Sequence, residues 1–170
     1  MTDLENVPLG GVLGIDPGSA SGCLAYLSGP FIGTWPIGSL TDQELADLTL
    51  GLAKRARFVL IEQVGAMPKQ GLSSTFKFGA NYGALRALVA ASGTRWALVL
   101  PARWQRALEC LTKGDKRIAR TKAQQVFPQH KVRAVEADAL LIAAYGASLE
   151  FGRVFSLQAL GARVDDLLGF

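Results

Sequence analysis

Three carboxylates interrupt the most apolar segments of this chain, and their placement restricts the fold more than any other feature. Asp16 ends the segment VLGI, Glu62 ends FVLI, and Asp138 lies at the start of ADALLIAAY. Short apolar runs of this kind are typical of buried strands, and a carboxylate among buried groups is costly unless something compensates its charge. If the two strands are neighbours and the last segment is a helix that packs over their ends, the three carboxylates meet.

The remaining pattern predicts an α/β architecture. Thr41 and Glu44 form a capping-box pattern, Pro101 is suited to a first helical position, and Asp115 to a cap. The order βββαβαβαα predicts one mixed five-stranded sheet flanked by helices. We expect strands at 12–16, 22–27, 31–37, 58–62 and 96–100, and helices at 42–55, 73–92, from 101 to before 114, from 115 to about 127, and 136–149.

Length and composition favour a single soluble domain. The 170 residues are 49% hydrophobic, enough for one core. The opening residues do not have the pattern of a signal peptide, and no run of about 18 apolar residues occurs. We therefore expect a cytoplasmic protein that does not engage a membrane. The two cysteines, Cys23 and Cys110, are expected to be buried free thiols.

The positive charge is concentrated in the middle of the chain. Thirteen of the eighteen Lys and Arg residues, but only two of the fourteen acidic residues, lie between Lys69 and Arg133. A basic segment between acidic flanks favours binding to a polyanion such as nucleic acid.

The three carboxylates suit divalent cations. Asp138 shares the apolar face of its helix with Leu141 and Ile142, so it is predicted to point toward the core. Mg²⁺ accepts a few carboxylates and keeps other positions for water or phosphate, and two such ions can promote phosphodiester hydrolysis. Structural roles remain open for each residue alone: a turn for Asp16, a core arginine pair for Glu62, and a helix-terminus charge for Asp138.

The ordered motifs resemble a known family. GIDPGSASG, a strand that ends IEQV, and EADALLIAAYG on the last helix are similar to the RuvC-type Holliday junction resolvases of the RNase H-like superfamily. AMPKQG, FKFGANYGALRALVAASG, PARWQ and KGDKRIARTKAQQVFP look most like the bacteriophage and chloroplast branch. The resemblance covers about residues 12–148, which we take as the domain core, and leaves 150–170 as a tail of unknown role. The resemblance implies an RNase H-like fold in which Asp16, Glu62 and Asp138 bind Mg²⁺, or Mn²⁺ in its place, in a homodimeric endonuclease that resolves four-way DNA junctions.

The last helix departs from the family pattern. The family usually has an acid or histidine three or four residues before the last carboxylate, whereas Val135 and Ala134 stand there in this chain. Glu136 is included in the predicted catalytic and metal-binding set if it precedes the first helical turn; otherwise it is a helix-terminus charge. His130 is expected to be solvated.

A DNA surface is predicted beside the carboxylates. Its basic and amide residues are suited to phosphate contacts. Phe76 is a candidate for stacking on bases at a branch point, with a core position as its alternative, and Trp104 is expected in the core. The predicted DNA-binding residues are Lys69, Gln70, Lys77, Asn81, Lys113, Lys116, Arg117 and Arg120.

Two other functions remain open. One is an RNase H-like nuclease that acts on structured RNA, and the other is a branched-DNA-binding protein whose catalytic site has decayed. We expect the protein to act in the cytosol of a bacterial or phage-infected cell.

Overall fold

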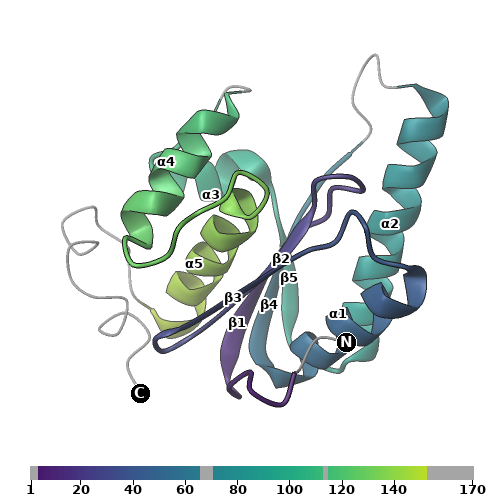
Figure 1. The fold of residues 1–170 in the computed structure, drawn as a ribbon, viewed down its shortest axis with the longest axis horizontal. Helices are drawn as coiled ribbons and strands as arrows, with labels where there is room; N and C mark the ends of the chain where they lie inside the picture. The colour runs from purple at the N-terminus through teal and green to yellow at the C-terminus, as the bar shows by residue number, and fades with distance from the viewer. Residues whose placement is uncertain (1–3, 66–70, 113–114, 153–170) are drawn as a thin grey trace.

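A mixed five-stranded sheet forms the centre of the computed structural model, which describes residues 4–65, 71–112 and 115–152 (Figure 1). The spatial order is β3-β2-β1-β4-β5. The first three strands form an antiparallel meander, and β4 and β5 extend the sheet parallel to β1. The strands are β1 (Gly11–Asp16), β2 (Cys23–Ser28), β3 (Phe31–Pro36), β4 (Ala56–Glu62) and β5 (Trp96–Val99). The predicted sheet is confirmed.

Helices flank this sheet, and their starts follow the sequence signals. Thr41 and Glu44 form the expected capping box, Pro101 occupies the start of α3, and the Asp115 side chain accepts a hydrogen bond from the Arg117 backbone. None of the helices in the described ranges combines the length and hydrophobicity needed to cross a bilayer. The helices are α1 (Asp42–Arg55), α2 (Leu72–Ala91), α3 (Pro101–Ala107), α4 (Lys116–Val126) and α5 (Ala137–Phe151).

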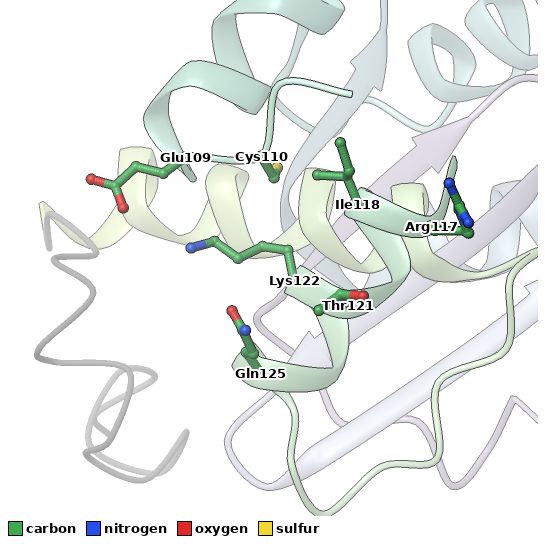
Figure 2. A pocket seen from close by; sticks show the side chains of 7 residues that line it. All are labelled: Glu109, Cys110, Arg117, Ile118, Thr121, Lys122 and Gln125. Carbon is green, nitrogen blue, oxygen red and sulfur yellow. The ribbon is translucent and has the colours of Figure 1, made fainter. Parts of the chain in front are cut away.

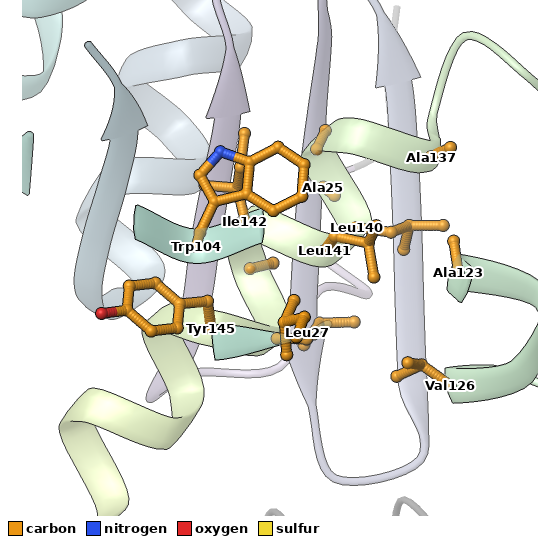
Figure 3. Packing of buried hydrophobic residues seen from close by; sticks show 14 of the residues in the cluster. Ala25, Leu27, Trp104, Ala123, Val126, Ala137, Leu140, Leu141, Ile142 and Tyr145 are labelled. Carbon is orange, nitrogen blue, oxygen red and sulfur yellow. The ribbon is translucent and has the colours of Figure 1, made fainter. Parts of the chain in front are cut away.

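Each face of the sheet has its own hydrophobic core. Alternate strand residues point to opposite faces, so Leu13 and Ile15 pack on the α1 and α2 side, whereas Val12 packs on the α5 side. Trp104 of α3 lies fully buried in the α5-side core, as expected (Figure 3). The two faces are therefore covered by different helices, and the α5 side receives α3, α4 and α5.

Helix α5 lies directly on the backbone of β1. A Cβ atom on Gly14 would come within 2.3 Å of the Ala143 backbone nitrogen and 2.5 Å of the Ala139 carbonyl oxygen. These are main-chain atoms, which cannot rotate away as a flexible side chain can. Gly14 therefore permits the close approach that sets the height of α5 above the sheet.

Candidate functional site

Asp16 and Glu62 end two neighbouring parallel strands. The printed register pairs Ile15 of β1 with Ile61 of β4, so the two carboxylates follow side by side. Val12 and Leu60 belong to the α5-side core, and by strand alternation Asp16 and Glu62 project to that same face. Both side chains are partly buried. The sequence prediction of adjacent strands ending in carboxylates is confirmed in placement.

Asp138 lies near these strand ends, on the face of the sheet that α5 covers. It lies in the first turn of α5. The carbonyl of the next residue, Ala139, faces Gly14 of β1. Asp16 is two residues beyond Gly14 on the same face of β1, toward the N-terminal end of α5. The packing of α5 therefore brings the third carboxylate to the same edge of the sheet.

The charges of the three carboxylates interact. Burial, together with the neighbouring charges of Asp16 and Asp138, raises the pKa of Glu62 to about 7, although a hydrogen bond from Trp104 acts in the opposite direction. That bond runs from the indole Nε1 to Glu62 Oε1 over 2.9 Å. Trp104, expected only in the core, is thus both core and a direct partner of the site, a role that apolar spacing does not reveal.

The raised pKa of Glu62 predicts a stability cost at neutral pH without metal. Because the folded-state pKa of about 7 exceeds the ordinary 4.5, the folded protein binds more protons between these values, and the free energy of unfolding falls as pH rises through them. Glu62→Gln cannot ionise and is expected to be more stable than the wild type above pH 7, by on the order of 2 kcal/mol, and equal to it near pH 4.5. Urea unfolding in EDTA across this range measures the difference.

Asp47→Asn is the matched control for this experiment, since Asp47 is exposed on α1 on the opposite side of the sheet. It is expected to show no such pH-dependent gain. Adding Mg²⁺ at pH 7.5 should stabilise the wild type more than Glu62→Gln. If the wild type and Glu62→Gln were equally stable at every pH, the pKa of Glu62 would not be raised in the folded protein.

Glu136 is the centre of a separate network. Its residue exposure is 1%, and it receives hydrogen bonds from Thr34 Oγ1 at 2.7 Å, from the Arg133 backbone at 2.6 Å and from the Arg133 guanidinium at 2.9 Å. His130 Nε2 lies 3.1 Å from Oε1, so this histidine is half-buried and partnered rather than solvated. Both carboxylate oxygens are engaged, and the network joins β3 to the residue that precedes α5. Glu136 is the N-cap residue of α5 and so precedes the first helical turn, as its predicted metal-binding role requires; that role stays a prediction. In this structure the carboxylate tethers β3 to the start of α5.

Electrostatics agree with this role. Burial raises the pKa of the Glu136 carboxyl, but the hydrogen bonds from Arg133 and Thr34 and the charge of Arg133 outweigh burial and leave the pKa below its usual value. The ionised form is therefore the one that the fold stabilises. Arg133 and His130 were not among the predicted site residues, and only the spacing of Arg133, three residues before Glu136, hinted at the pair.

Glu136→Gln is expected to lower the free energy of unfolding by about 2–4 kcal/mol. The NH₂ group of the new glutamine would face the buried hydrogen-bond donors of Thr34 and Arg133, which now donate to the carboxylate. A simple helix-terminus charge would cost only about 0.3–1 kcal/mol. Urea denaturation distinguishes the two values. Asp115→Asn is the matched control, since it exchanges an exposed carboxylate at a helix cap and should change stability little. If Glu136→Gln lowered the free energy of unfolding no more than Asp115→Asn does, Glu136 would not tether β3 to α5.

The predicted DNA-binding residues have different surroundings. Lys77 is exposed on α2, and Arg117 is exposed but paired with Asp115 at 2.9 Å. Arg120 Nε donates to the Val132 carbonyl at 3.2 Å. Lys116 is the first residue of α4. Lys69, Gln70 and Lys113 lie outside the described residues.

The side chain of Asn81, another predicted DNA-binding residue, also has a partner within the protein. Its Nδ2 donates to the Pro17 carbonyl over 2.9 Å and ties α2 to the turn that follows Asp16. The polar face of α2 predicted for a ligand is thus used in part to hold that turn. Phe76, in contrast, is 78% exposed, so the core alternative for this residue is wrong.

A divalent cation fits the donor set by its chemistry. Asp16, Glu62 and Asp138 supply only carboxylate oxygens, which hard cations prefer, at one partly buried edge. As the side chains lie, however, no three His, Cys, Asp or Glu residues in the described ranges are grouped to hold one ion. Asp16 Oδ1 accepts instead from the Gly18 backbone at 3.3 Å, and Glu62 accepts from Trp104. The metal ligands therefore stay a prediction.

Comparison with solved structures identifies the fold. A structure of Thermus thermophilus RuvC in complex with a Holliday junction substrate superposes with a TM-score of 0.60 at 18% identity, and a second structure of Thermus thermophilus RuvC with 0.58 at 19%. Both alignments cover 84% of this chain and 96% of the other. The chain has the RNase H-like fold seen in RuvC. Within this RNase H-like fold, the three carboxylates lie at the ends of β1 and β4 and the start of α5. No protein-family model matches the sequence, and a search among curated proteins gives no match.

Proposed function

We propose that this protein is a Mg²⁺-dependent endonuclease that cleaves four-way DNA junctions. The observation that carries the proposal is the position of Asp16, Glu62 and Asp138 at one edge of a RuvC-like sheet. A neighbour of the same fold was solved with a Holliday junction. The motif resemblance to the bacteriophage and chloroplast branch points to the same substrate.

In this proposal the carboxylates hold the cations and the surrounding residues keep them in place. Divalent ions, when bound, would activate the attacking water and stabilise the leaving oxygen of the phosphodiester. Trp104 fixes one oxygen of Glu62, and Asn81 holds the turn after Asp16. Glu136 anchors the start of the helix that carries Asp138. Exposed basic residues on α2 and α4 would neutralise phosphates.

Cleavage of an immobile four-way junction with and without Mg²⁺ tests the proposal. We expect paired nicks only in the presence of the metal, with Mn²⁺ able to replace it, and no comparable cutting of linear duplex or of structured RNA. Preferential RNA cutting would support the RNA nuclease instead.

A catalytically decayed junction-binding protein is the second candidate, and one observation favours it. The described carboxylates are not grouped around a common metal position, and Val135 and Ala134 replace the residue that the family usually has before Asp138. Tight junction binding by the wild type without cutting in Mg²⁺ or Mn²⁺ would select this candidate.

We expect the working form to be a C2 homodimer, because two symmetric nicks need two sets of carboxylates. Helix α2 offers the surface: Leu72 and Phe76 are 91% and 78% exposed, and only Leu85 and Val89 of the described α2 side chains are buried. Sedimentation should give a dimer, and Leu72→Ser should shift it toward monomer. Leu149→Ser, at a 49% exposed position on α5, should not. A wild type that stays monomeric even on the junction would contradict the dimer.

A further inference from the structure

A polar pocket of about 310 Å³ lies between α4 and the segment after α3 (Figure 2). Five of its lining residues come from α4, and two precede that helix. A single water needs only about 10–15 Å³ of such space, so the pocket is ample for one phosphate group. The lining residues are Glu109, Cys110, Arg117, Ile118, Thr121, Lys122 and Gln125.

Lys122 is the unusual member of this cavity. The residue is only 6% exposed, yet it makes no hydrogen bond or ion pair with any residue in the described ranges. Figure 2 shows its side chain extended from α4 toward the side on which Glu109 lies. A buried charge is costly without a counter-charge. By contrast, the buried Glu136 is surrounded by donors.

The other groups in the cavity favour an anion. Thr121 and Gln125 bring neutral donors, and Arg117 a second cation. Glu109 is the one carboxylate in the lining, and it forms no ion pair with Lys122. Because the Arg117 guanidinium is already paired with Asp115, the ammonium of Lys122 is the cation of the lining that remains available to an incoming oxyanion.

The cavity adjoins an exposed groove. Burial raises the pKa of the Cys110 thiol in the cavity to about 11, while the charge of Lys122 lowers this pKa and the charge of Asp138 raises it. On the outer side, a groove lined by Arg117, Arg120, Thr121, Gln124 and Gln125 shares three residues with the cavity. A continuous polar track suits a chain of phosphates better than an isolated ion.

We propose that the Lys122 cavity binds a backbone phosphate of the DNA strand that approaches Asp138, with Lys122 as its central contact and Thr121 and Gln125 as supporting donors. The inference rests on the proposed function for its ligand. It adds a phosphate site that the basic surface of α4 does not by itself define, because Lys122 faces inward rather than outward.

Lys122→Met tests the site, since methionine keeps an unbranched chain of similar length and removes only the charge. In equilibrium binding to a four-way junction, the variant should bind several-fold more weakly, and the slope of log K against log salt should fall by about 0.9, the value for one phosphate contact. Lys54→Met, an exposed lysine on α1 across the sheet, is the matched control and should leave the slope unchanged. An unchanged slope for Lys122→Met would overturn the proposal.

Thermal unfolding in inorganic phosphate gives a readout that needs no junction. Lys122→Met should melt higher than the wild type in phosphate-free buffer, because the unpartnered charge is gone, and added phosphate should stabilise the wild type and Lys54→Met but not Lys122→Met. Equal stabilisation of all three would contradict the site. A wild type that shows this phosphate response but binds no junction would leave the cavity in place and refute the proposed function.

Discussion

Asp138→Asn should eliminate Mg²⁺-dependent cleavage of a four-way junction while leaving junction binding within about threefold of the wild type. Asn keeps the size of the side chain and its place in the first turn of α5 but removes the charge that would hold a cation. Loss of a single group that stabilises a transition state typically costs 10²–10³-fold in rate, so we expect at least about 100-fold. Single-turnover cleavage under saturating protein measures the chemical step apart from binding.

Asp16→Asn should reproduce this loss, because the two carboxylates lie at the same edge, whereas Asp47→Asn on α1 should not. Binding survives in each variant because the basic surface is untouched. Robust cutting by Asp138→Asn would break the three-carboxylate assignment. Loss of binding together with cutting would mean that the substitution had disturbed α5 instead of the chemistry.

Gly14→Ala should destabilise the protein by about 3 kcal/mol or more and reduce cleavage even where the protein stays folded. The added Cβ would meet the Ala143 nitrogen at 2.3 Å and the Ala139 oxygen at 2.5 Å, so α5 must move away from β1. Overpacking of a core generally costs about 1–3 kcal/mol, and a clash between main chains lies at the upper end or above. Urea unfolding and single-turnover cleavage of the folded fraction measure the two effects.

Gly146→Ala is the matched control at the same interface. Its Cβ would approach the end of the Val12 side chain at 3.0 Å and Leu60 Cβ at 3.3 Å, and the helix gains up to about 1 kcal/mol from the replacement of glycine. We expect a change within about 1 kcal/mol of the wild type. If Gly14→Ala were as mild as this control, the backbone contact would not set the position of α5.

Most of the fold could be predicted from local patterns. The capping box at Thr41, Pro101 at the start of α3 and the Asp115 cap are contained within a few residues, and all are found in the structure. The edge position of the carboxylates could also be predicted, because it follows from the parallel direction of two apolar strands.

The partners of the site residues could not be predicted, because they come from distant parts of the chain. Thr34 contacts Glu136 across 102 positions, and Trp104 contacts Glu62 across 42. Asn81 looked free on the polar face of its helix, yet it bonds to Pro17, 64 positions away. Periodicity tells which face a side chain occupies, but only packing tells which atom that side chain meets.

The contact of α5 with Gly14 also bears on how such a protein can diverge. Where the separation of a helix and a strand is set by side chains, each substitution in the layer changes their spacing. Here two backbones meet at one glycine, so the surrounding apolar residues can drift in size and shape over evolutionary time while the height of α5 stays fixed. A lineage with this joint can lose most of its sequence identity and still inherit the same placement of its acidic residues.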